Sequence, residues 1–100
     1  MIRIFKYPIN NQAVTTITCR RKRFLDIQSQ NGNLVCWIEI DDDAPEIMTT
    51  LVQIGTGWEI PSEFMNGAKY LKTIQDNFGY VWHFYEVLGG AEPQSCGGAL

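Results

Sequence analysis

The sequence predicts a mainly β fold, a single small antiparallel β-sandwich or partly open barrel of about six or seven strands with at most one short helical turn. Two observations lead to this prediction. Apolar and polar residues alternate with a period of two, and turn-forming residues separate these segments about every 8–12 residues. One hundred residues allow one domain. We expect this β-rich domain over residues 1–88 and a flexible, Gly-containing tail over 89–100.

Three strands are expected before the sharpest turn signal. Residues 2–7 alternate, and Pro8 ends that segment because proline cannot donate a ladder hydrogen bond. Residues 13–19 are rich in β-branched side chains, which favour strands. Residues 24–30 alternate again and run into Asn31-Gly32. This pair tolerates the positive φ angles of a two-residue hairpin turn, so we predict a hairpin here.

The middle of the chain continues the same pattern. Residues 34–40 form the next expected strand, and the acidic segment 41–45 breaks it at its proline. Residues 46–54 form a fifth strand, which ends at Gly55-Thr56-Gly57. Residues 61–65 are expected to form one short helical turn, because proline is favoured in the first turn and Asn-Gly follows.

The last two strands are expected over 70–75 and 80–87, with a turn over 76–79. Both faces of segment 80–87 are apolar. A strand of that kind in a small antiparallel sheet lies inside a sandwich or contributes to an interface. It is the best sequence-level sign of a homo-oligomer or of a binding partner.

Charge is distributed unevenly. Residues 1–25 carry six Lys/Arg and no acid, whereas residues 26–100 carry two Lys and eleven acids, and the net charge is −3. A net negative chain does not favour general nucleic-acid binding. The basic run Arg20–Arg23 is expected to be a turn or an exposed edge that resists strand-on-strand aggregation. A phosphate- or RNA-binding patch is its alternative.

Composition also predicts the cellular setting. No segment reaches the roughly 18 apolar residues of a membrane helix, and the first residues do not form the apolar core of a signal peptide. Three cysteines without CxxC spacing do not indicate a disulfide scaffold and favour a reducing compartment. We expect neither a membrane partner nor a secreted protein.

No catalytic or metal-binding constellation is evident, so we predict a non-enzyme without metal or cofactor. His83 is the single histidine and is expected to be half-buried and hydrogen-bonded. Cys36 falls on the apolar face of its strand and is expected to be a small core residue. Segment 41–45 lacks the alternating acids and central glycine of a calcium loop. Gly55-Thr56-Gly57 is expected to be a turn, since no helix follows to complete a phosphate loop.

Several short blocks occur in order between residues 6 and 86. They are Lys6-Tyr7-Pro8, Gln30-Asn31-Gly32, Cys36-Trp37, Asp43-Ala44-Pro45, Ile54 to Ile60, Tyr70 to Gln75 and Val81 to Glu86. Through these blocks the chain resembles a family of small phage and prophage proteins without an assigned activity. Asp42 stands where that family's loop carries proline, and the basic run lies outside the shared pattern. The resemblance implies a location in the host cytoplasm.

These observations together predict a phage accessory protein that binds a host macromolecule, a protein or protein complex, and inhibits an antiviral defence system such as CRISPR–Cas. The alternatives are an oligomeric sponge for a nucleotide second messenger, a virion or morphogenesis component and, last, a hydrolase using Cys36 and His83. The loops 41–45 and 55–59 and the basic run are the predicted contact surface. Its candidate residues are Arg20, Arg21, Arg23, Asp41, Asp42, Asp43, Trp58 and Glu59, with Trp58 as the expected anchor.

Overall fold

The computed structural model describes residues 1–9 and 12–87. Its elements in chain order are β1 (Ile2–Pro8), β2 (Val14–Cys19), β3 (Arg21–Gln30), β4 (Asn33–Asp41), β5 (Ile47–Gly55), α1 (Ser62–Met65), β6 (Ala68–Gln75) and β7 (Val81–Val87). The expected strands and the helical turn are all present, with ends within a few residues of those predicted. The tail expected over 89–100 lies outside the described residues.

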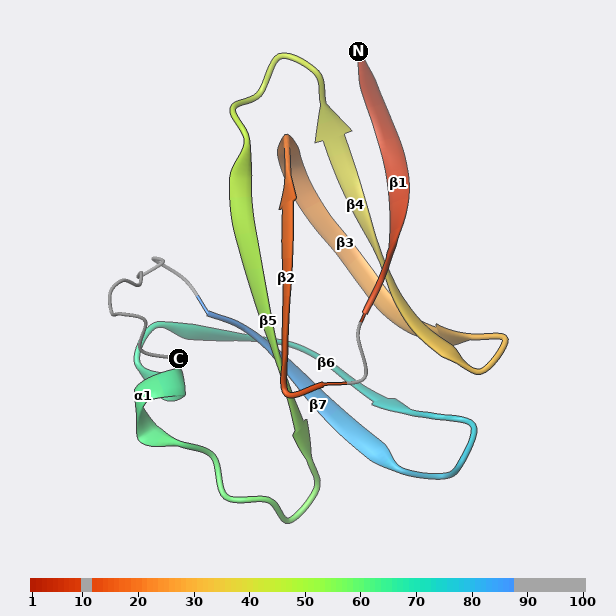
Figure 1. Ribbon diagram of the computed structural model, residues 1–100, viewed down its shortest axis with the longest axis vertical. Helices are drawn as coiled ribbons and strands as arrows, with labels where there is room; N and C mark the ends of the chain where they lie inside the picture. Colours follow the sequence, from red (N-terminus) through yellow and green to blue (C-terminus); the bar gives the residue numbers. More distant parts are fainter. Residues whose placement is uncertain (10–11, 88–100) are drawn as a thin grey trace.

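The strands form two antiparallel sheets, which Figure 1 shows side by side in the molecule. One sheet has the order β1-β4-β3 and the other the order β2-β5-β7-β6. The mainly β prediction is confirmed, and the described strands do not close into a barrel. The chain passes from one sheet to the other between β1 and β2, between β2 and β3, and again between β4 and β5.

The basic run was expected to form either a turn or an exposed edge, and it does not form a turn. β3 begins at Arg21, so only Arg20 forms the corner between the sheets, and the carbonyl of Arg20 accepts a hydrogen bond from the amide of Asp41 at 3.0 Å. The other three basic residues belong to β3, which is an edge strand. The edge position is therefore the one found.

The hairpin predicted at Asn31-Gly32 is confirmed. Asn31 has φ 52° and Gly32 has φ 83°, so both residues occupy the left-handed region that this turn requires. Gln30 and Asn33 are opposite one another across the turn. This local geometry sets the register of β3 against β4, and the register in turn decides which side chains reach the core.

Side chains from both sheets form one core. β4 points alternate residues inward, as expected, and Cys36 and Ile38 are fully buried there. The cluster of buried residues consists of Ile9, Ile17, Cys19, Ile27, Cys36, Ile38, Ile40, Leu51 and Phe84. The prediction that Cys36 is a core residue is confirmed. Phe84 places the inner face of β7 in the same core, and Leu71 and Ile74 of β6 pack against it.

Candidate functional site

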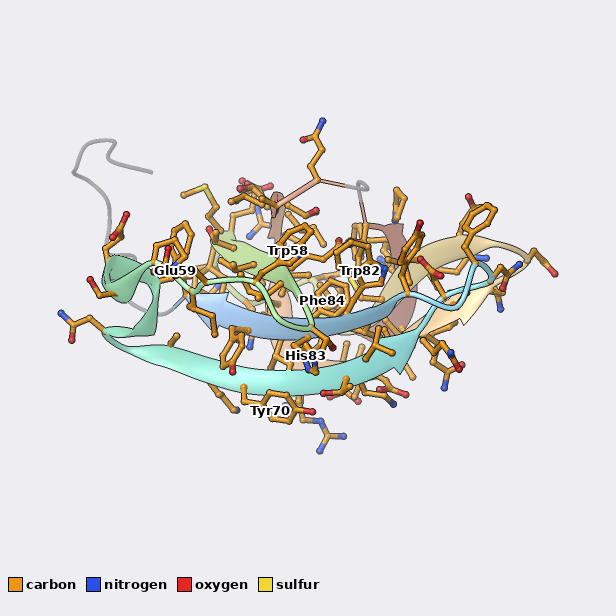
Figure 2. All side chains as sticks on the ribbon, turned by 90° about the horizontal axis from the view of Figure 1, so that it is seen from below. Trp58, Glu59, Tyr70, Trp82, His83 and Phe84 are labelled. Atoms are coloured by element: carbon orange, nitrogen blue, oxygen red, sulfur yellow. The ribbon has the colours of Figure 1, made fainter. Side chains whose placement is uncertain are left out.

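Three aromatic side chains gather where β5 ends and β7 begins, and we call Trp58, Tyr80 and Trp82 the aromatic end. The indole of Trp58 lies edge-on to that of Trp82, with ring centroids 5.4 Å apart and planes at 85°. The ring of Tyr80 is tilted by 54° to Trp82, at 6.3 Å. Figure 2 shows Trp58 and Trp82 on the same side of β7. The rings of Trp58 and Tyr80 therefore lie at different angles to the ring of Trp82.

A glycine turn places Trp58. The amide of Trp58 donates to the carbonyl of Gly55 at 3.0 Å, and Gly57 has φ 87°, which glycine adopts without strain. A Cβ on Gly55 would stand 2.7 Å from the Trp58 ring. Gly55 therefore lacks a side chain where the indole folds back over the backbone. The prediction of a turn at this glycine motif is confirmed.

One carboxylate positions the other two rings. Asp76 accepts a hydrogen bond from the indole N–H of Trp82 at 2.9 Å, and its other oxygen accepts from the amides of Phe78 and Tyr80 at 2.8 and 3.0 Å. The hydrogen bond from Trp82 is the main reason that the pKa of Asp76 lies below its ordinary value, and the backbone amides lower this pKa further. These hydrogen bonds hold the β6–β7 turn against the indole of Trp82.

The rings surround an open cavity of about 470 Å³. The cavity is lined by Gly55, Thr56, Trp58, Gly79, Tyr80, Val81 and Trp82. None of these residues is a carboxylate or a cation. Trp58 is 56% exposed and Tyr80 is 65% exposed, so the aromatic surface faces solvent. A hollow of this kind can take a flat or apolar group from a binding partner.

A chain of hydrogen bonds on the opposite side of β7 ties His83 to the same turn. The Nε2 atom of His83 lies 2.7 Å from the hydroxyl of Thr56, and Nδ1 lies 3.0 Å from the hydroxyl of Thr73. Thr73 in turn contacts the hydroxyl of Tyr70 at 2.6 Å, and Figure 2 shows His83 and Tyr70 below β7. The prediction of a half-buried, hydrogen-bonded histidine is confirmed.

Cys36 and His83 do not form a nucleophile pair. Cys36 lies in the core, where burial raises the pKa of its thiol to about 12, so a thiolate is disfavoured at neutral pH. His83 points away from that core and is engaged by two threonine hydroxyls. The arrangement required for a hydrolase that uses these two residues is therefore not assembled.

A family model matches residues 1–94 of the chain. The chain belongs to the family described as a domain of unknown function, DUF7352. Neither the curated proteins nor the solved structures gave a match. The matched range contains both sheets and the whole aromatic end, so this site lies within the domain that defines the family.

The predicted contact surface of this DUF7352 domain is divided by the fold. The acidic loop precedes β5 and the Trp58 turn follows it, so Figure 1 shows the two loops at opposite ends of the molecule. At about 3.3 Å a residue, β5 separates them by about 26 Å. One compact partner surface does not include both loops. Trp58 and Glu59 remain together at the aromatic end, and both are exposed.

The acidic loop has basic neighbours from its own chain. Arg3 pairs with Asp42 at 2.8 Å, and Arg20 donates to the carbonyl of Ala44 at 2.7 Å. The side-chain carboxylate of Asp41 accepts from the amide of Asp43 at 3.0 Å. Arg20 and the aspartates therefore form one mixed-charge corner of the molecule.

The remaining basic candidates point in different directions. Arg21 reaches inward, where its guanidinium contacts both oxygens of Glu86 and the hydroxyl of Thr49 at 2.9 Å. Arg23 is largely exposed and lies 3.6 Å from a carboxylate oxygen of Glu39. Arg21 is therefore a part-buried ion-pair residue, while Arg23 stays accessible at the surface.

Sequence reasoning missed Tyr80, Trp82 and Asp76 as parts of the site. A signal was present, because the segment from Tyr80 to Val87 is apolar on both faces and pointed to an interface. What the sequence did not show is that Trp82 lies against Trp58, 24 positions earlier in the chain.

In the described part of the chain, no helix is long and apolar enough to cross a membrane. Nor do the described His, Cys, Asp and Glu residues include a group of three or more that could hold a metal ion.

Proposed function

We propose that this chain is a non-enzymatic binding protein and that the aromatic end is its contact site for a protein partner. The observation that carries the proposal is the exposed Trp58, held perpendicular to Trp82 over a cavity of about 470 Å³. Tryptophan and tyrosine are enriched among the residues that dominate binding energy at protein interfaces. The aromatic end brings three residues of these two types together.

Hydrogen bonds hold the parts of the site in place. Trp82 is fixed by Asp76, Trp58 by the glycine turn, and the turn itself by the contact of Thr56 with His83. Binding of a partner therefore costs little side-chain conformational entropy, which favours affinity. Because the lining carries no carboxylate or cation, the group that enters is expected to be an apolar, flat or cationic side chain attracted by ring faces.

The resemblance to phage proteins supports a more specific form of the proposal. In that form the chain acts in the cytoplasm of a host cell, and its partner is a host protein complex of an antiviral defence system such as CRISPR–Cas. A homo-oligomer would use the same exposed rings. A virion or morphogenesis component is the competing form, in which the partner is another phage protein.

A tagged pull-down from infected or defence-bearing host cells, read by mass spectrometry, tests the proposal. We expect a stoichiometric partner with the unchanged chain, and at least a roughly 30-fold weaker capture by Trp58→Ala, the loss typical of a central interface anchor. Phe78→Ala is the matched control. Phe78 is more exposed, at 82%, and it lines a different hollow together with Ile9, so its loss should leave capture unchanged.

Circular dichroism and melting temperature show that both variants are folded. Equal capture by the two variants would place the contact surface elsewhere. A further variant with Asp41, Asp42 and Asp43 changed to alanine tests the other end of β5. Loss of the partner in that variant alone would assign binding to the acidic loop instead. Capture of virion proteins only would favour the morphogenesis form.

A further inference from the structure

A second hollow lies between the neighbouring outer strands of the two sheets, and we call it the β3–β6 seam. It has a volume of about 360 Å³ and is lined by residues 21–27 of β3, residues 69–72 of β6 and Glu86. Figure 1 shows β3 and β6 each at the edge of its own sheet. We propose that this seam binds a small phosphate-bearing ligand.

The charge of the seam is opposite to that of the chain. Five basic side chains and two acidic ones line the hollow, although the whole chain carries −3. The five are Arg21, Lys22, Arg23, Lys69 and Lys72. A concave surface on which one sign of charge predominates attracts ions of the opposite sign. The expected ligand is therefore an anion.

The two acids of the seam are already neutralised. Glu86 is held by the guanidinium of Arg21, and Asp26 is held by the ammonium of Lys72 at 2.8 Å. Lys22 and Lys69 form no ion pair with any residue that the structure describes. Their charges are left for a group from outside the chain. Both side chains are exposed, so a ligand can reach them.

The backbone explains why the hollow stays open. The register of β3 slips between Arg21 and Arg23 and again between Phe24 and Asp26, and that of β6 slips between Tyr70 and Lys72. Such irregularities bend an edge strand and interrupt its pairing. The two edges approach each other without joining into one sheet. Basic side chains from both edges consequently share one space.

Edge protection alone does not account for this arrangement. Charged residues, lysine above all, protect edge strands from aggregation, but this role does not require the charges of two edges to meet in one hollow. Here lysines from two strands share the lining of one hollow, where they repel each other unless an anion lies between them. An anion that bridges Lys22 and Lys69 removes this repulsion.

The dimensions indicate the size of the ligand. A volume of about 360 Å³ is near the lower end of the range for small-molecule sites, roughly 300–1,000 Å³. The basic side chains outnumber the acidic ones by five to two, which suits a group with several negative charges, such as a pyrophosphate or a nucleotide phosphate chain. The net negative charge of the chain disfavours a long nucleic acid.

Thermal shift and calorimetric titration with inorganic pyrophosphate, ATP and adenosine test the proposal. We expect the melting temperature to rise with pyrophosphate and with ATP, because a ligand of the folded state stabilises it, and to stay unchanged with adenosine. The combined change of Lys22→Ala and Lys69→Ala should weaken pyrophosphate binding by about tenfold or more, since it removes two charge-assisted contacts to the anion.

Lys6→Ala is the matched control. Lys6 is an exposed lysine on β1, at the far edge of the same sheet as β3, and it donates to Gln30 at 2.8 Å. Its loss should leave pyrophosphate binding unchanged. No thermal shift at millimolar pyrophosphate would overturn the proposal, and so would equal binding by the double lysine variant. A shift caused by adenosine alone would also contradict it.

Competition between ligands shows whether the phosphate comes from a free small compound or from a nucleic acid. If ATP and pyrophosphate displace each other and a short oligonucleotide does not displace them, the ligand is a free phosphorylated compound. If the oligonucleotide binds more tightly and displaces both, the small-ligand proposal is wrong and the seam is a nucleic-acid contact. Trp58→Ala should not alter pyrophosphate binding, so failure of the aromatic end and failure of the seam are distinguishable.

Discussion

Asp76 shows how a single residue prepares the aromatic end, and its titration gives a testable pH dependence. Its carboxylate accepts from Trp82, Phe78 and Tyr80, and the hydrogen bond from Trp82 is the main cause that lowers its pKa below the ordinary 3.8. A carboxyl with a lower pKa in the folded state contributes stability that is present above 3.8 and lost as the pH falls through the folded pKa. We therefore predict that Asp76→Ala lowers the melting temperature at neutral pH and that the difference from the unchanged chain shrinks on acidification.

Melting curves recorded from neutral to strongly acid pH check this prediction. Asp43→Ala is the control, because Asp43 is an exposed acid in the loop at the other end of β5 and should change the curve little. Since Asp26 and Asp42 also have lowered pKa values, the informative quantity is the difference between variant and unchanged chain. A difference that stays constant with pH would show that the carboxylate of Asp76 is not the origin of the effect.

At the scale of elements, Arg21 and Glu86 fasten β3 of one sheet to β7 of the other. The two side chains are only 17% and 7% exposed, so each depends on its partner for neutralisation. We predict that Glu86→Ala lowers the free energy of unfolding by about 3 kcal/mol, the lower end of the range for a buried pair, because it leaves the part-buried Arg21 charge unpaired. Arg21→Met combined with Glu86→Leu should recover most of that loss. Urea unfolding measures both variants, and a double variant as unstable as the single one would contradict this account.

The same pair shows what sequence alone could predict and what it could not. Strand positions follow from alternation and from turn residues such as Asn31-Gly32, which act over a few neighbouring residues, so they were predicted closely. The inward direction of Arg21 depends on Glu86, 65 positions later. Four successive basic residues therefore resembled a turn or an exposed edge. The strand order could not be predicted either, because it is decided by long-range pairing. Trp58 was predicted as an anchor, but its contact with Trp82 was not predicted.

On the scale of the whole molecule, β7 belongs to both proposed sites and keeps them apart. Trp82 lines the aromatic end near the start of β7, and Glu86 lines the seam near its end. Four residues of strand separate them by about 13 Å. Sites more than about 7–10 Å apart without shared partners have additive energies to within about 0.5 kcal/mol, which is about a twofold change in affinity.

We therefore predict that the two sites act independently. Adding Trp58→Ala to the Lys22→Ala and Lys69→Ala variant should leave its pyrophosphate affinity within about twofold, and saturating pyrophosphate should not alter capture of the partner by the unchanged chain. Titration of the variants and a pull-down with and without pyrophosphate measure this. A larger effect in either direction would show coupling between the sites, because linkage requires each ligand to change the affinity of the other by the same factor. β7, which carries residues of both sites, is the element through which such coupling would pass.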